Sequence, residues 1–134
     1  MSLQLPRGPD APRQARAAVL ERFGERLDAD AAYDVALVVS ELVTNSVQHA
    51  AAASAHEVGL EIGVVGDRIL ISVSDSGAQI VPHMAPRGEG SSKRLGLVLV
   101  DRLARSWGVA RDGTGHTCVW CELPLDPAGA ANLS

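Results

Sequence analysis

The sequence predicts an α+β fold, a two-layer sandwich in which helices cover one face of a mixed, mostly antiparallel sheet. Three observations lead to this fold class. Two helical patterns open the chain, two alternating apolar strands joined by a two-residue loop follow, and a third helix and two further strands come after a glycine-rich stretch. This order places the helices together on one side of the sheet.

The composition fits one compact domain. The chain has 134 residues, of which 46% are hydrophobic and 21% charged, enough to bury a sizeable core. A net charge of −4 and an aromatic content of 3% argue against nucleic-acid binding through phosphate neutralisation or base stacking. No apolar stretch approaches the roughly 20 residues that span a bilayer. We expect a cytoplasmic protein without a nucleic-acid or membrane partner, with a flexible segment at 1–11, a domain at 12–124 and a frayed tail at 125–134.

Two helices are expected at the start of the domain. In residues 12–27 apolar side chains recur at three- and four-residue steps and form one stripe. Asp28 or Asp30 offers an N-cap for the second helix, which is expected to continue to about Ala52. This second helix is apolar nearly all round over residues 35–47, which indicates that it is buried.

A hairpin follows the helices. Residues 58–64 alternate apolar side chains with glycine and glutamate, and Gly66-Asp67 is typical of a two-residue hairpin loop. The return strand, residues 69–75, ends on Asp75, whose carboxylate continues the apolar row of the strand.

The second half of the chain begins with a long loop. Residues 76–93 are rich in glycine and proline, and a loop of this length in a compact domain is typical of a lid, a binding loop or disorder. A third helix is expected over about 95–106. Two final strands near 109–111 and 116–123 are joined by the turn at 112–115.

Glu41 and Asn45 are polar residues in the helix that is otherwise predicted to be buried. They lie four residues apart, and His49 follows four residues later, so the three share one helix face. Oxygen ligands one helical turn apart can share a hard cation such as Mg²⁺. The alternative is that this face is exposed, with Glu41 in a salt bridge and Asn45 capping a local group.

Two further polar features could bind a ligand. Asp75 ends its strand, where its carboxylate could accept a hydrogen bond from an exocyclic amine and Gly77 would let the backbone approach a ring; an ordinary Asp-Ser-Gly turn is the alternative. Lys93 and Arg94 close a run of glycines and serines just before a helix, a natural anion site. Gly96 follows them, but the spacing is neither that of a Walker A motif nor that of a dinucleotide fingerprint, and a surface linker is the alternative.

The spacing of Cys118 and Cys121 raises the question of a redox pair or a zinc site. Their surroundings are typical of a strand, in which side chains three apart point to opposite faces, and only His116 could add a nearby zinc ligand. We therefore expect two reduced cysteines in a terminal strand.

In combination and in this order, these motifs resemble the histidine-kinase-like (GHKL, Bergerat-fold) ATPase superfamily, and within it the small stand-alone anti-sigma-factor serine/threonine kinases. The resemblance covers about residues 7–124 and implies a Bergerat-like ATP-binding fold. The matching segments are Glu41-Leu-Val-Thr-Asn45-Ser-Val-Gln-His49-Ala50 for the N box, Asp75-Ser76-Gly77 for the Asp-x-Gly box, Leu95-Gly96-Leu97-Val98-Leu99-Val100-Asp101 for the glycine box, and Gly115-His116-Thr117-Cys118-Val119-Trp120 for the final strand.

The resemblance implies a role for each matched residue, with ATP and Mg²⁺ as cofactors. Glu41 would be the general base, and Asn45 would coordinate Mg²⁺ between the phosphates. The adenine would be bound by Asp75, with Gly77 beside the ring and Thr117 in support. The phosphates would be wrapped by the segment that contains Lys93, Arg94, Gly96 and Leu97.

The implied reaction transfers the γ-phosphoryl group of ATP to a serine of a small anti-anti-sigma partner of the STAS type. Family members also bind a sigma factor, and the chain could pair as a homodimer. Three positions depart from the family pattern, since Gln79, Ser92 and Arg94 replace expected glycines and stiffen a loop that must approach phosphate closely. A competing hypothesis is therefore a non-catalytic binding module that uses nucleotide, if at all, only to fix its shape.

Overall fold

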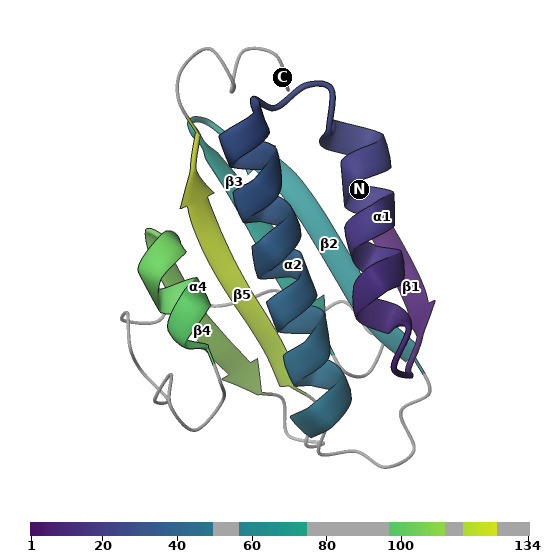
Figure 1. Ribbon diagram of the computed structural model, residues 1–134. Coiled ribbons are helices and arrows are strands. Elements are labelled where there is room, and N and C mark those ends of the chain that lie inside the picture. Colours follow the sequence, from purple (N-terminus) through teal and green to yellow (C-terminus); the bar gives the residue numbers. More distant parts are fainter. Residues whose placement is uncertain (50–56, 75–96, 112–116, 126–134) are drawn as a thin grey trace.

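The computed structural model of the chain describes residues 1–49, 57–74, 97–111 and 117–125. These form one five-stranded sheet of order β1-β2-β3-β5-β4, and the helices cover one of its faces, as Figure 1 shows. The two-layer α+β sandwich predicted from the sequence is confirmed. The elements are β1 (Ser2–Pro6), α1 (Ala11–Phe23), α2 (Ala29–His49), β2 (Glu57–Val65), β3 (Arg68–Ser74), α4 (Val98–Leu103), β4 (Ser106–Arg111) and β5 (Thr117–Pro124).

All four strand pairings of the described sheet are antiparallel, so its expected mixed character is not found in this part of the chain. The reason is that β5 enters between β3 and β4 and runs opposite to both. The predicted hairpin loop is confirmed. Val65 pairs with Arg68, and Gly66 has a φ of 61°, the left-handed conformation that a two-residue loop requires.

The prediction of a flexible segment at 1–11 is wrong for residues 2–6. They form the edge strand β1, which pairs antiparallel with β2 and buries Leu5 against the core. Five residues that end in Pro6 are too short a pattern to identify from the sequence alone, and proline is tolerated there because the strand lies at the sheet edge. Helix α1 then begins at Ala11, one residue before the predicted start.

The predicted boundaries of the helices shift at several ends. Helix α1 stops at Phe23, before the predicted Leu27. Asp28 caps α2, because its Oδ1 accepts a hydrogen bond of 2.7 Å from the backbone N–H of Ala31. The predicted end of α2 at Ala52 lies outside the described residues. Helix α4 is shorter than the predicted range 95–106, since the backbone is already extended at Ala104 and β4 begins at Ser106.

The predicted frayed tail also begins too early. Leu125 is buried, and its backbone N–H donates a hydrogen bond of 2.7 Å to the carbonyl of Asp67 in the hairpin loop. The remaining tail lies outside the described residues.

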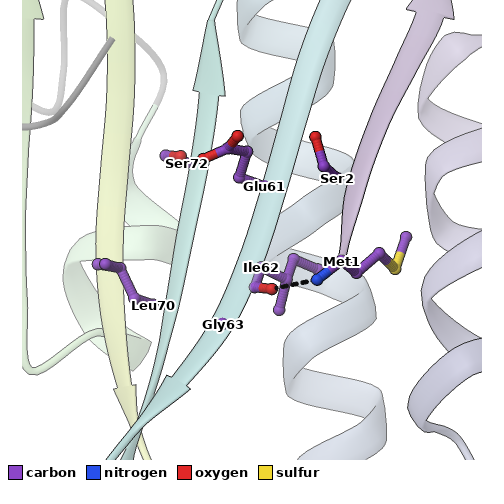
Figure 2. A pocket seen from close by; sticks show the side chains of 7 residues that line it. All are labelled: Met1, Ser2, Glu61, Ile62, Gly63, Leu70 and Ser72. Carbon is purple, nitrogen blue, oxygen red and sulfur yellow. Dashed lines mark hydrogen bonds between the residues drawn. The ribbon is translucent and has the colours of Figure 1, made fainter. Parts of the chain in front are cut away.

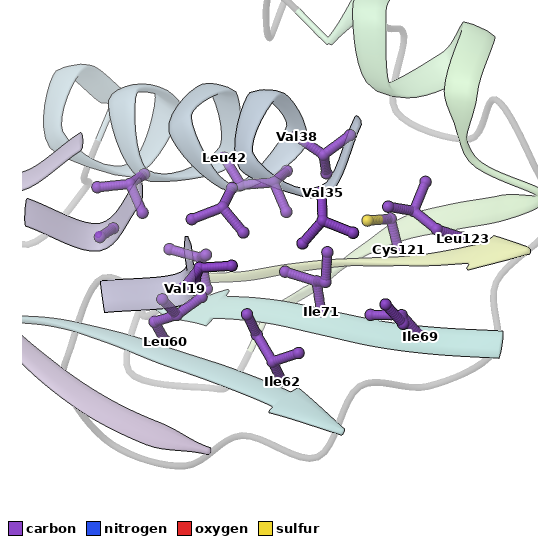
Figure 3. Packing of buried hydrophobic residues seen from close by; sticks show 14 of the residues in the cluster. Val19, Val35, Val38, Leu42, Leu60, Ile62, Ile69, Ile71, Cys121 and Leu123 are labelled. Carbon is purple, nitrogen blue, oxygen red and sulfur yellow. The ribbon is translucent and has the colours of Figure 1, made fainter. Parts of the chain in front are cut away.

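The core lies between the helices and the inner face of the sheet, as the side chains in Figure 3 show. Helix α1 contributes every fourth residue of its stripe, from Ala11 to Phe23, and α2 contributes most of its apolar surface. Burial of such side chains stabilises a fold by roughly 25 cal/mol per Å² of apolar surface. Among the described helices, none is long and apolar enough to cross a membrane.

Candidate functional site

Asn45 on helix α2 is a buried polar residue whose hydrogen bonding is incomplete. Its side chain is 6% exposed, and its Oδ1 atom has no hydrogen-bond partner among the residues that the structure describes. An unpaired buried acceptor costs about 1–3 kcal/mol, so such an atom marks a place where a ligand, an ion or a water supplies the missing partner. The alternative in which Asn45 caps a local group through this oxygen is therefore not found within the described part of the chain.

Glu41 lies one helical turn before Asn45 and is half-buried. No salt bridge engages its carboxylate among the residues that the structure describes. The alternative of a salt-bridged Glu41 on a solvated face is therefore not found. The helix carries the carboxylate of Glu41 and the amide of Asn45 on one face, as the four-residue spacing predicts.

Ser46 is a second buried polar residue that the sequence analysis missed as a candidate. It is 7% exposed, and within the described ranges its Oγ atom also lacks a hydrogen-bond partner. Ser46 lies four residues after Leu42, in the stripe of α2 that packs on the sheet. A serine at a position where the helical period predicts an apolar residue was the signal that could have identified it.

The C-terminal end of α2 lies at the end of the sheet where β3 stops and β5 begins (Figure 1). Ser74, the last residue of β3, is buried and pairs with Cys118, and Thr117 opens β5 as a half-buried residue. The last described turn of α2, the last residue of β3 and the first residue of β5 therefore lie at one end of the sandwich, and Asp75, which follows Ser74 in the sequence, lies outside the described residues.

A comparison with known families identifies this arrangement. A family model described as the histidine kinase-like ATPase domain matches residues 6–122. The chain belongs to the histidine kinase-like ATPase family. The resemblance to the superfamily is thereby confirmed, and ATP is the ligand that this family membership implies. A search of curated proteins finds no match, and the relation to anti-sigma-factor kinases stays a prediction.

The described part of the glycine box in this ATPase domain, residues 97–101, begins with a residue that packs in the core. Leu97 precedes α4 and is fully buried in the apolar cluster. Helix α4 packs against α2 and β4. Because the side chain of Leu97 faces the core, only its backbone could contribute to the nucleotide site that the sequence predicts.

Five of the predicted site residues of the ATPase domain lie outside the described residues. Gln79 and Ser92, which depart from the family pattern, also lie outside the described residues. Of the predicted set, the structure therefore places Glu41, Asn45, Leu97 and Thr117. The residues outside it are Asp75, Gly77, Lys93, Arg94 and Gly96.

The donor set at the end of α2 fits a hard cation. The free Oδ1 of Asn45 is a neutral oxygen acceptor, and the nearby Glu41 adds a carboxylate on the same face. Mg²⁺ prefers oxygen ligands and is commonly held by one or two protein oxygens together with substrate phosphates and waters. No group of three or more histidine, cysteine, aspartate or glutamate side chains in the described ranges could hold a metal ion by itself.

The cysteines of the ATPase domain are not joined by a disulfide. Both are buried, and their separation along β5 places them on opposite faces of the sheet, as predicted. Burial raises the pKa of Cys121 to about 12, with a smaller contribution from the charge of Glu122. A thiol of this kind stays protonated and unreactive at neutral pH.

A shallow concavity of about 350 Å³ lies on the sheet face that points away from the helices, over β1, β2 and β3 (Figure 2). Glu61 is the only acidic side chain among its lining residues. It shares no residue with the candidate nucleotide site. Its lining residues are Met1, Ser2, Glu61, Ile62, Gly63, Leu70 and Ser72.

Proposed function

We propose that the protein is an ATP-binding regulator, namely a protein serine/threonine kinase that acts as an anti-sigma factor. Its substrate would be a serine on a STAS-type anti-anti-sigma protein, and a sigma factor would be its second partner. The observation that carries the proposal is the buried Oδ1 of Asn45 in a histidine kinase-like ATPase domain. This atom lies one helical turn after Glu41 and has no hydrogen-bond partner in the part of the chain that the structure describes. The likeness of the four sequence boxes to the small serine kinases supports the finer assignment.

Asn45 would hold Mg²⁺ through the oxygen atom that the protein leaves unpaired. When bound, Mg²⁺ supplies neutralisation of the charge on the phosphates of ATP. Because Asn45 projects from a long helix packed on the sheet, its amide is held by the core and has little freedom to reorient. Pre-organisation of this kind lowers the entropy that is lost on binding.

Glu41 would act as the general base. As the serine oxygen of the partner attacks the γ-phosphorus, its bond to phosphorus forms, the bond to the β-γ bridging oxygen breaks, and ADP leaves. The hydroxyl proton passes to the carboxylate of Glu41, which is half-buried and has no salt-bridge partner among the described residues.

The base of ATP would lie at the end of the sheet. Thr117 stands there at the start of β5, and Asp75 follows the last residue of β3. Ser46, whose hydroxyl is buried without a partner and faces the sheet, would add a polar contact on this side. The Oδ1 of Asn45 and the Oγ of Ser46 would thus contact different parts of one nucleotide.

Calorimetric titration of ATP with and without Mg²⁺ tests the binding step. The wild type is expected to bind more tightly with Mg²⁺, and Asn45→Ala is expected to lose that difference. Gln48→Ala, which truncates an exposed amide in the same turn of α2, is the matched control and should bind as the wild type does. No binding by the wild type at about 1 mM ATP, a free energy weaker than about −4 kcal/mol, would refute the proposal.

Phosphoryl transfer requires a second experiment. The protein, a STAS-type partner and ATP labelled at the γ-phosphate are mixed, and label on the partner is measured. Glu41→Gln is expected to abolish transfer while ATP binding is retained, because it removes the base but leaves Asn45, the proposed Mg²⁺ ligand, in place. Transfer at the wild-type rate in this variant would contradict the role of Glu41.

A non-catalytic nucleotide-binding or protein-binding module is the second candidate function. The observation in its favour is the replacement of expected glycines by Gln79, Ser92 and Arg94. This function predicts ATP binding without labelled partner, or partner binding without ATP. The two experiments together therefore separate the candidates.

A further inference from the structure

Arg7 joins the end of β1 to the last turn of α2. Its Nη2 atom donates a hydrogen bond of 3.3 Å to the backbone carbonyl of Val47, across 40 residues of sequence. Val47 lies two residues after Asn45, so this contact is made beside the candidate cation ligand.

The position of this contact is set by the chemistry of a helix end. The last four carbonyls of an α-helix have no partner within the helix, and the C-terminus carries a partial negative charge. The described part of helix α2 reaches His49, so the carbonyl of Val47 lies in its last described turn. The guanidinium of Arg7 supplies both a donor and a compensating positive charge.

Asn45 depends on the same turn. In an α-helix the backbone carbonyl of residue 45 accepts a hydrogen bond from the N–H of residue 49, and both residues lie within α2. If the final turn frays, Asn45 loses this bond and its side chain gains freedom to leave its buried position. The order of the last turn therefore controls where the amide oxygen of Asn45 lies.

Arg7 is itself held on both sides. Before it, Leu5 is buried and Pro6 pairs with Glu57 at the start of β2. After it, the N–H of Ala11 donates a hydrogen bond of 3.1 Å to the carbonyl of Gly8, which leads directly into α1. The guanidinium therefore starts from a fixed backbone, and little entropy is lost when it binds the helix end.

We propose that Arg7 is a positioning residue of the nucleotide site, which holds the last turn of α2 and through it the cation-binding oxygen of Asn45. This inference rests on the proposed ATP-binding function. It assigns to the N-terminal strand a part in ATP binding that goes beyond completing the sheet. The binding of Mg²⁺ and the order of residues 1–7 are then linked, and each stabilises the other.

The test compares ATP affinity with and without Mg²⁺ for Arg7→Ala, Arg7→Lys and Arg16→Ala. Arg16 is the matched control, since it also donates a hydrogen bond to α2. Its Nη1 atom lies 3.4 Å from the hydroxyl oxygen of Ser40, which precedes the turn that carries Asn45. Arg7→Ala is expected to weaken Mg²⁺-ATP binding by about three- to tenfold and Mg²⁺-free binding by less than about twofold. Arg7→Lys should recover most of the loss, and Arg16→Ala should bind as the wild type does.

Two results would overturn the inference. Arg7→Ala could keep the wild-type Mg²⁺ dependence, or it could lose affinity equally with and without Mg²⁺, as a general loss of stability would cause. Amide exchange over residues 45–49 of the nucleotide-free protein supplies a separate readout, in which Arg7→Ala is expected to exchange faster and Arg16→Ala unchanged. If Arg7→Ala exchanges faster but the wild type does not bind ATP, the proposed function is refuted while the contact between Arg7 and α2 stands. If exchange in Arg7→Ala is unchanged, the positioning role of Arg7 is itself refuted.

Discussion

The indole Nε1 of Trp107 donates a hydrogen bond of 2.9 Å to Oδ1 of Asp101, and this bond links α4 to β4 across the two residues that separate them. Trp107 is fully buried in the apolar cluster, so its N–H depends on a protein partner. Asp101 supplies that partner from the helix that continues the glycine box. The bond therefore fixes α4 on the sheet close to the candidate nucleotide site.

The first prediction concerns this bond. Asp101→Ala is expected to destabilise the fold by about 1–3 kcal/mol, because it leaves the indole N–H buried without an acceptor. Urea unfolding followed by tryptophan fluorescence measures the change. Asp101→Asn is the control, since its amide oxygen can still accept the bond, and it should lose less. Equal losses in the two variants would show that the hydrogen bond is not the cause.

The second prediction concerns Ser46. Ser46→Ala removes a buried hydroxyl without a partner, so the free energy of unfolding in the absence of nucleotide should be unchanged or rise by up to about 1 kcal/mol. ATP affinity should fall, because the hydroxyl is proposed to contact the nucleotide. Thermal unfolding and calorimetric titration measure the two effects. In Ser40→Ala, which removes a hydroxyl that Arg16 contacts, ATP affinity should stay unchanged.

A third prediction follows from Glu122. Its side chain is 11% exposed, and its Oε2 accepts hydrogen bonds of 3.0 Å from Arg68 and 3.1 Å from Ser106. Arg68→Met should lower the free energy of unfolding by about 1–2 kcal/mol. The mostly buried carboxylate of Glu122 loses its positive partner, and water replaces only part of that interaction.

A double-mutant cycle with Glu122→Gln isolates this pair. The combined variant should lose less than the sum of the single variants, and strict additivity would contradict the coupling. Arg105→Met is the matched control. Arg105 lies 4.0 Å from Asp67 in an exposed ion pair, so its replacement should change stability by less than about 1 kcal/mol.

A fourth prediction is a pH dependence from Cys121. Its pKa in the folded protein is about 12, above the ordinary value of 9.0. Below pH 9 both the folded and the unfolded chain hold the proton, so the stabilisation is fully present. Above pH 9 the unfolded chain releases the proton and the folded protein keeps it, so stability should fall by about 1.4 kcal/mol per pH unit until the folded pKa is reached.

Denaturant unfolding between pH 8 and 11 measures this slope. Cys121→Ala provides the reference, because it lacks the thiol while the other titrating groups remain. The wild type should lose stability more steeply than the variant above pH 9. Parallel curves would show that the thiol does not titrate as its burial implies.

The sequence alone was sufficient for the elements whose signals are local. The alternation of residues 58–64 and the Gly66-Asp67 loop predict the hairpin, because strand periodicity and turn chemistry act over a few residues. The four-residue spacing of Glu41 and Asn45 predicts their common helix face for the same reason. The match of the family model to residues 6–122 confirms that these local patterns identify the superfamily.

Only the tertiary structure decided which of these groups have partners. Strand β1 exists because β2 pairs with it from more than 50 residues away, a contact that no local pattern encodes. The free oxygens of Asn45 and Ser46 and the bond from Arg7 to Val47 likewise depend on what packs around the end of α2. Periodicity specifies the face of a helix on which a side chain lies, whereas burial and hydrogen bonding depend on segments that meet only when the chain folds.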